Sequence, residues 1–402
     1  MSPRRVLAIL ASAELLAMAP WFSASAVAPA LSRVWRLDVA GAAWLTISVQ
    51  LGFVAGALLS AVLTLSDRWS ARRLVAGCAT LASVASLGVA WAPSARAGIA
   101  LRMLTGAALA GVYPPGMKLV AGWYKEGRGL AIGVLVGALT VGSALPHLVR
   151  WAVPADHWRT VLEIAAGTAF VGGLLVLLVP HDGPFAAPAA AFTWRAAPRL
   201  FADRAVSLAN LGYLGHMWEL YAMWTWLAVF VAASERARIG ADASAGAVPA
   251  LVTFAVVASG AVGCWLGGKY ADRWGRTLVT SAAMTMSGCC ALAVGLVFAQ
   301  PLVLLVPLLL VWGVAVVADS AQFSAAVSEL APRELVGTAL TVQTSLGFLL
   351  TCLTIYLLPS VAERIGWRWS MSLLALGPVA GVWAMMALRR RPEAVALAAG
   401  RR

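Results

Sequence analysis

Charged residues are scarce in this chain. Of its 402 residues only 12% are Asp, Glu, Lys or Arg, whereas 61% are hydrophobic. A soluble globular domain carries about 25% charged residues, so the composition excludes that class. The apolar residues fall in runs of about 20, which is the length that a helix needs to cross a bilayer. The sequence therefore predicts an all-α membrane protein.

Cysteine is rare as well, and motifs for common catalytic chemistry are missing. The five cysteines all fall inside apolar runs, where we expect them to pack as small apolar side chains. The sequence contains no Walker motif, metal-ligand cluster, nucleophile elbow or dinucleotide loop. We therefore predict no cofactor, no metal site and no enzyme activity.

The apolar runs predict twelve membrane-spanning helices. Their approximate ranges are 6–31, 42–65, 73–93, 97–120, 129–151, 158–180, 205–233, 245–268, 276–299, 302–326, 336–359 and 368–388. The longest polar segment, 181–204, is rich in Pro and Ala and is interpreted as a cytoplasmic linker. It divides the chain into an N-terminal six-helix bundle, 1–180, and a C-terminal six-helix bundle, 205–402.

The net charge of +13 favours a membrane orientation rather than a nucleic-acid partner. With the N-terminus in the cytoplasm, 20 of the 30 Lys and Arg residues fall in cytoplasmic loops and tails. Cytoplasmic loops of membrane proteins carry such an excess. We expect both termini in the cytoplasm, the bacterial inner membrane as the location, and a monomer.

A short phrase recurs in the first and seventh predicted spans. Residues 12–22 read SAELLAMAPWF, and residues 217–227 read MWELYAMWTWL, so that Glu14 recurs as Glu219 after 205 positions. Asp67 and Arg68 recur at the same offset as Asp272 and Arg273. One offset held over such a distance predicts two pseudo-symmetric halves around a central cavity.

Several loop motifs resemble those of a known transporter family. Residues 268–276, GKYADRWGR, resemble the signature G-x-x-x-D-R-x-G-R of the major facilitator superfamily, and Arg102-x-x-x-Gly106 is similar to its second motif. More weakly, PWFSASAV and YPPGMK resemble the nitrate, nitrite and cyanate porters. The arginines that nitrate carriers of that kind use in spans 2 and 8 are absent. The resemblance implies a twelve-helix secondary transporter.

The signature loops suggest a cytoplasmic latch. An aspartate at a helix end can pair with an arginine at the start of a neighbouring helix, and such pairs would hold the halves together until they part. The alternative is that these charges only satisfy helix ends. The latch candidates are Asp67, Arg68, Gly268, Asp272, Arg273, Gly275 and Arg276.

Ionisable residues inside the predicted spans are few, and a central charge there costs roughly 2.5–3.5 kcal/mol. In the resembled fold, spans 1, 4, 7 and 10 line the cavity, and Glu14, Arg102, Glu219 and Asp319 fall one to each of them. Glu14 heads a helical stripe and Glu219 heads its repeat, so we expect two cavity walls, although Met at these positions suits core packing equally. The substrate and proton candidates are Glu14, Met18, Trp21, Arg102, His216, Glu219, Met223, Trp226, Asp319 and Gln322.

The roles of these residues stay open at the level of sequence. Burial disfavours a charged carboxylate, so Glu14, Glu219 or both could couple transport to protons, or form a static pair with Arg102. Arg102 could bind an anionic substrate or hold a carboxylate partner. Asp319 is expected near the cytoplasmic end of its span, where access to water would explain it.

The sequence as a whole predicts a secondary active transporter that works by alternating access and is coupled to protons. Uptake of a small organic or inorganic anion is one reading. A proton antiporter that exports cationic or amphipathic compounds is the alternative within transport. A membrane sensor of the same fold that moves no substrate is the third. The expected partners are a small molecule, protons and lipid, with no nucleic acid.

Overall fold

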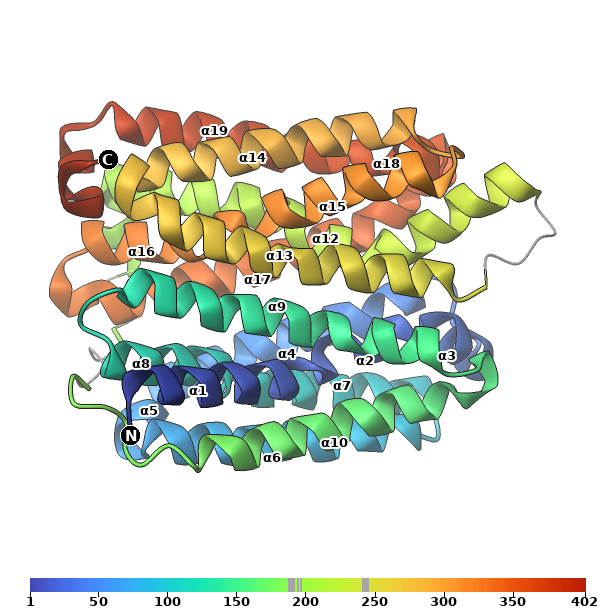
Figure 1. Cartoon of the computed structure of the whole chain (residues 1–402), viewed down its shortest axis with the longest axis horizontal. Coiled ribbons are helices and arrows are strands. Elements are labelled where there is room, and N and C mark those ends of the chain that lie inside the picture. Colours follow the sequence, from blue (N-terminus) through green and yellow to red (C-terminus); the bar gives the residue numbers. More distant parts are fainter. Residues whose placement is uncertain (187–191, 194, 196, 241–245) are drawn as a thin grey trace.

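The computed structural model describes residues 1–186, 192–193, 195, 197–240 and 246–402, with the side chains of 66, 67 and 197 left out. The described part is built from helices that run roughly parallel to the long axis (Figure 1). Both termini lie at one end of the molecule, which we call the termini end, and the opposite end is the far end.

The first half contains the elements of six spans, and two of these spans are broken. The first span begins at Pro3 and is interrupted at Pro20, because a proline cannot donate the helical hydrogen bond. The elements are α1 (Pro3–Met18), α2 (Pro20–Ala26), α3 (Ala28–Trp35), α4 (Val39–Val62), α5 (Leu65–Arg68), α6 (Ala71–Ala90), α7 (Ala95–Leu109), α8 (Tyr113–Trp123), α9 (Arg128–Ala152), η1 (Ala155–His157) and α10 (Trp158–Val176).

The second half repeats this plan after the short helix α11 (Ala197–Ala202). Its elements are α12 (Arg204–Ile239), α13 (Val248–Trp274), α14 (Arg276–Ala293), η3 (Val294–Leu296), α15 (Leu302–Ala318), α16 (Ser320–Leu330), η4 (Arg333–Leu335), α17 (Val336–Ile365), α18 (Trp367–Ser370), η5 (Met371–Ala375), α19 (Leu376–Arg389) and η6 (Pro392–Gly400). Eleven stretches of the described chain are long and apolar enough to cross a membrane. The twelfth span is α12, which has 36 residues but carries more polar side chains.

Equivalent helices pack together in the two halves. In the first half α1 packs on α9 and α10, and α4 packs on α7. In the second half α12 packs on α17 and α19, and α13 packs on α15. The predicted fold class, two pseudo-symmetric six-helix bundles, is therefore confirmed. The boundaries of the bundles at residues 180 and 205 stay a prediction.

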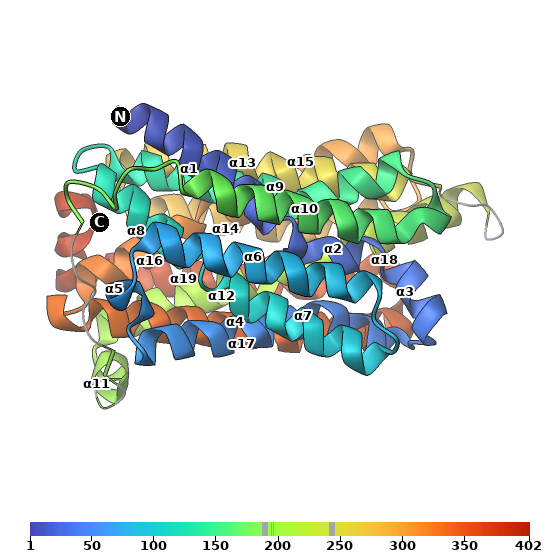
Figure 2. The same ribbon diagram turned by 90° about the horizontal axis from the view of Figure 1, so that it is seen from below.

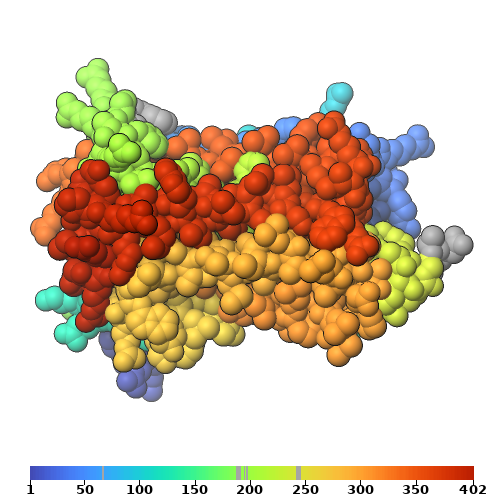
Figure 3. Space-filling model, turned by 90° about the horizontal axis from the view of Figure 1, so that it is seen from above, coloured from blue at the N-terminus to red at the C-terminus, as the bar shows by residue number. Residues whose placement is uncertain are grey.

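The halves meet along two helix pairs. α9 lies against α13, and α4 lies against α17, on opposite sides of the interface (Figures 1 and 2). Glycine permits the closest approach at the first pair, since a Cβ on Gly133 would come within 3.0 Å of the carbonyl oxygen of Cys264. Figure 3 shows the face covered by the second half, with the C-terminal segment at the termini end.

Two spans are broken near their middle. α7 ends at Leu109 and α8 restarts at Tyr113, directly before Pro114 and Pro115, whose missing N–H groups favour a break there. The equivalent break in the second half separates α15 from α16 at Asp319.

Candidate transport site

Six aromatic side chains fill the interface between the halves, between its middle and the far end of the molecule. Phe53 of α4 and Phe348 of α17 have ring centroids 4.5 Å apart, and Trp21 of α2 lies 5.1 Å from Phe53 and 5.6 Å from Phe348. Phe22 stacks on Tyr221 of α12 at 6.2 Å. We call this set the aromatic layer, and it consists of Trp21, Phe22, Phe53, Tyr221, Trp224 and Phe348.

A polar layer lies next to the aromatic layer, toward the termini end. Tyr113 of α8 is close enough to interact electrostatically with Glu14, Tyr213 and Cys264, which come from α1, α12 and α13. Glu14 precedes Trp21 by seven residues, or about 10 Å at the helical rise. The two layers therefore form one continuous region to which both halves contribute. Glu14 and the polar side chains lie on the side of the termini end, and the aromatic layer lies on the side of the far end.

Glu14 is the acid of this polar layer. Its side chain is only 2% exposed. Its Oε2 lies beside Gly116, where a Cβ would come within 2.8 Å, and its Oε1 has no hydrogen-bond partner among the described residues. A buried polar atom without a partner costs free energy. This carboxylate is therefore suited to take a proton or a cationic ligand.

Glu219, the repeat partner of Glu14, has a different environment. Its Oε1 accepts a hydrogen bond from Trp312 Nε1 at 2.6 Å, and its Oε2 accepts one from Ser287 Oγ at 2.8 Å. Both donors belong to the second half. At the repeat offset, Ser287 corresponds to Ala82, which cannot donate. Glu219 is thus anchored within one bundle, and its role in proton coupling stays a prediction.

The face of α12 that meets the first half is not the predicted one. Trp226 donates from Nε1 to the carbonyl of Ile355 at 2.9 Å and packs on Trp367, so its stripe points into the second half. Tyr221 and Trp224 instead reach the first half. The sequence contains a pattern that could have indicated this face, because Tyr213, Tyr221 and Trp224 are spaced so that they share one side of a helix.

Arg102 is fully buried and bound to backbone. Its Nε donates to the carbonyl of Leu45 at 3.1 Å. Its Nη1 donates to the carbonyl of Pro20 at 2.5 Å, and its Nη2 donates to that of Trp21. In the described part of the chain these partners are backbone carbonyls and the Ser23 hydroxyl, so the alternative of a carboxylate partner is not supported. The guanidinium ties α7 to α4 and to the break between α1 and α2.

Asp319 also departs from expectation. It is 1% exposed, so access to water does not explain it. Its Oδ1 lies 2.9 Å from Nδ1 of His216, which is equally buried. Gln322, one turn later, accepts a hydrogen bond from Arg276 at 2.7 Å. The prediction failed because it measured depth along a straight helix, whereas the break at Asp319 places this residue inside the second half against α12.

The predicted latch ties elements of the second half to one another. Arg276 binds Glu329 of α16 at 2.6 Å and approaches Asp272 of α13 to 3.7 Å. The carboxylate of Asp272 also faces the start of α9, where a Cβ on Gly129 would lie 3.4 Å from Oδ2. In the described part of the chain the ion pairs of Arg276 lie within the second half, and a latch between the halves stays a prediction. Arg68 and Arg273 are exposed, and the side chain of Asp67 lies outside the described residues.

The family model of the Major Facilitator Superfamily matches residues 10–355. The chain belongs to this superfamily. Among solved structures of the same fold, a D-xylose–proton symporter gives a TM-score of 0.76 with 16% identity over 97% of this chain and 98% of that chain. A bacterial homologue of the lysosomal transporter Spinster, in an inward-facing conformation, gives 0.73 with 16% identity over 96% and 97%.

A curated relative adds a shorter match. The multidrug efflux pump LfrA of Mycolicibacterium smegmatis (strain ATCC 700084 / mc(2)155) is 33% identical over 171 residues. These cover 39% of this chain and 31% of that protein, so the match spans about a third of the relative's length. Superfamily membership and the transporter structures point to a membrane transporter rather than an enzyme.

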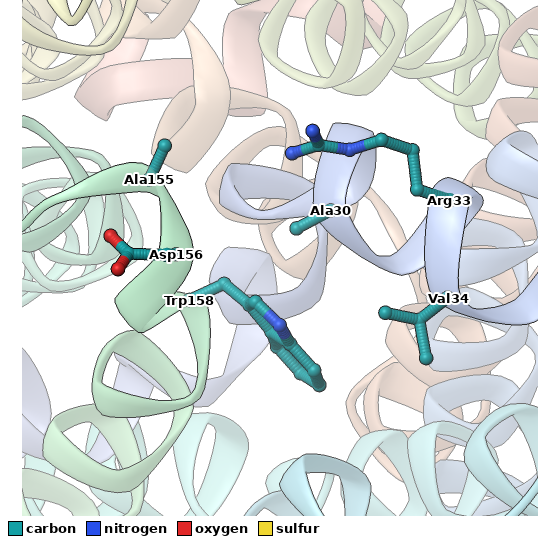
Figure 4. A pocket seen from close by; sticks show the side chains of 6 residues that line it. All are labelled: Ala30, Arg33, Val34, Ala155, Asp156 and Trp158. Atoms are coloured by element: carbon teal, nitrogen blue, oxygen red, sulfur yellow. The ribbon is translucent and has the colours of Figure 1, made fainter.

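The polar layer also contains Tyr113, Tyr213 and Cys264, which are not among the site residues predicted from the sequence. Hydroxyl and thiol groups in apolar spans give a weak signal, because Tyr and Cys are common packing residues. A shallow pocket of about 340 Å³ lies elsewhere, at the far end between α3 and η1. Figure 4 shows Arg33 and Asp156 among its lining residues. None of the predicted site residues lines it.

Proposed function

We propose that the protein is a secondary active transporter that exchanges protons for an aromatic or amphipathic organic cation. One observation carries this proposal, namely the Glu14 carboxylate, which is buried beside the aromatic layer and has one oxygen without a described partner. A ligand cation would neutralise this carboxylate when the two halves separate. A proton would do so in the absence of the ligand.

The aromatic layer supports a cationic substrate over an anionic one. Aromatic faces attract cations, and flat rings pack well against aromatic ligands. Trp21 and Trp224 also keep ring N–H groups that have no partner among the described residues. Arg102, the candidate for binding an anion, has its donors directed at backbone carbonyls. The matching segment of a multidrug efflux pump is consistent with this direction.

The membrane arrangement is part of the proposal. We infer that the termini end faces the cytoplasm of a bacterial cell and that the chain works as a monomer. The halves 1–180 and 205–402 then rock around the polar layer, and 181–204 links them. We infer that the packed rings of the aromatic layer close the way from Glu14 to the far end and that rocking parts them.

Flux measurements on the purified protein in liposomes test the proposal. An acidic liposome interior creates an outward proton gradient. Three probes are added outside: ethidium, nitrate and D-xylose. We expect accumulation of ethidium, a permanently charged aromatic cation, and none of the other two. Accumulation of nitrate under the reversed gradient, with the acidic side outside, would instead favour the anion carrier. A protein that binds ethidium without moving it would be a sensor, and the transport proposal would fail.

A further inference from the structure

His216 and Asp319 form a buried ionisable pair that the cation site does not use. Nδ1 of His216 and Oδ1 of Asp319 lie 2.9 Å apart, and the two side chains are 2% and 1% exposed. Nε2 of His216 lies 2.9 Å from Oγ of Ser320. Three polar side chains therefore contact one another where α12 meets the junction of α15 and α16.

This cluster can gain or lose one proton while its contacts stay in place. Without the proton, Nδ1 of neutral His216 faces the Asp319 carboxylate at 2.9 Å, and Nε2 accepts from the Ser320 hydroxyl. With the proton, both ring nitrogens carry N–H groups, and the Ser320 hydroxyl becomes the acceptor for Nε2. The net charge of the pair changes from −1 to 0, and the proton comes from and returns to water.

The surroundings of the pair close it off from water. The titratable groups that face the pair are Tyr213 and Glu219 on α12 and Cys264 on α13. Phe323 of α16 lies 5.6 Å from the His216 ring and excludes water. A proton can therefore pass between the pair and water only when the site opens.

The pair also lies at the junction between two helices, α15 and α16. Asp319 follows the last residue of α15 and precedes the first residue of α16. The carboxylate of Asp319 interacts favourably with the amide dipoles at the start of α16, and a proton on His216 offsets the net charge of the pair there. Further along α16, Arg276 holds Gln322 and Glu329. A change in the net charge of the pair would therefore act on α16.

We propose that His216 and Asp319 bind a second coupling proton in the second half, separate from the cation site at Glu14. This inference rests on the proposed function. It predicts that the two sites can be lost independently, because Glu14 contacts the substrate whereas the pair carries only the driving ion.

Two ethidium rates in liposomes test this separation. The first is accumulation driven by an acidic interior, and the second is exchange of labelled for unlabelled ethidium at equal pH. For His216→Gln and Asp319→Asn we expect accumulation to fall about tenfold relative to exchange, within the usual range of coupling between two sites. Exchange itself should persist, because it needs no net proton movement.

His147→Gln is the matched control, since His147 is another buried histidine but has no carboxylate partner among the described residues. It should leave the ratio of the two rates unchanged. A ratio that stays at the wild-type value in both pair variants would overturn the inference. So would the loss of exchange together with accumulation, which would place the pair in the substrate site.

A proton count needs neither substrate nor transport. Between about pH 9 and about pH 5, the range of histidine and carboxyl titration, the detergent-solubilised wild type should take up about one proton more than Asp319→Asn. Equal uptake would overturn the inference even if ethidium is no substrate. If the pair variants fail to fold, Ser320→Ala removes one hydroxyl only, and an unshifted pH profile of accumulation would count against the site.

Discussion

The buried charges of this transporter differ in whether their partners are already in place. Arg102 has bonded donors on three nitrogens, Glu219 has a donor for each oxygen, and Glu14 keeps one oxygen free of described partners. Satisfied groups stabilise one conformation, and unsatisfied groups bind ligands. This contrast separates structural charges from functional ones better than their position in the sequence.

Arg102 gives a prediction about stability. Arg102→Lys replaces a planar fork with a single ammonium group, so at least one of the bound carbonyls loses its donor. We expect a loss of about 2 kcal/mol or more, seen as a lower Tm in detergent. Ethidium affinity should stay near that of the wild type. Arg33→Lys, on the exposed helix α3, is the control and should leave the Tm unchanged. An unchanged Tm in Arg102→Lys would contradict the structural role.

Glu219 gives a second prediction at the same scale. Glu219→Gln keeps an oxygen for Trp312, so ethidium exchange should continue at roughly the wild-type rate. Glu219→Ala leaves two buried donors unmatched and should cost about 1–3 kcal/mol of stability. Thermal melting and exchange on the same preparations check both expectations. If Glu219→Gln abolished accumulation while folding normally, this glutamate would belong to the coupling machinery.

Sequence reasoning found the right residues more often than their partners. Glu14, Arg102, His216, Glu219 and Asp319 stood out because ionisable groups are rare in apolar spans. Their contacts could not be predicted, since these depend on rotation about each helix axis and on the helix breaks. Glu14 and Glu219 occupy equivalent places in a repeat, yet only Glu219 has two donors beside it.

At the scale of elements, the C-terminal segment acts as a strap on α16. The backbone N–H of Ala398 donates to Glu329 at 3.1 Å, and Arg401 donates to the carbonyl of Asp272. Leu397 and Ala394 are fully buried against this end of the molecule. The strap and Arg276 both hold α16, which is the segment that continues from the His216–Asp319 pair.

Deleting residues 392–402 should therefore loosen α16. We expect faster amide hydrogen exchange over residues 320–330, because local opening depends on such packing and hydrogen bonds. α8, the equivalent helix of the first half, serves as the internal control and should exchange as before. Mass spectrometry of the exchanged protein measures both segments at once. Equal protection of α16 with and without the strap would contradict the assigned contact.

The elements themselves could be predicted from sequence with few errors. Apolar runs located the spans. The break at Asp319 and the docking of η6 could not be foreseen, because both involve contacts between elements far apart in the sequence. The spacing of Glu219, Met223 and Trp226 predicted a functional face that the structure turns into the second half.

At the scale of the whole molecule, the repeat predicted two bundles, and the packing of equivalent helices confirms them. Sequence could not indicate which conformation is populated, since that depends on contacts between the halves. In the structure those contacts are the aromatic layer and the α9–α13 pair. Alternating access then requires the aromatic rings to separate in each cycle.

A cross-link across the aromatic layer tests this requirement. Cysteines at positions 53 and 348 replace the two rings that are 4.5 Å apart, in a chain whose own cysteines are changed to alanine or serine. Joining them with a short thiol reagent should stop ethidium exchange, and a cleavable reagent should restore it on reduction. Either single cysteine, treated in the same way, is the control. Exchange that continues in the cross-linked protein would show that this layer does not open.

The cation site at Glu14 is the claim on which the functional account depends most. Ethidium exchange at equal pH, measured in liposomes for the wild type, Glu14→Gln and Glu163→Gln, tests it most directly. Glu163 lies on α10 and supplies a matched replacement of another glutamate in a membrane helix. The account predicts that Glu14→Gln lowers the exchange rate about a hundredfold, as expected when a buried charge partner is lost, and that Glu163→Gln does not. Wild-type exchange in Glu14→Gln would contradict it.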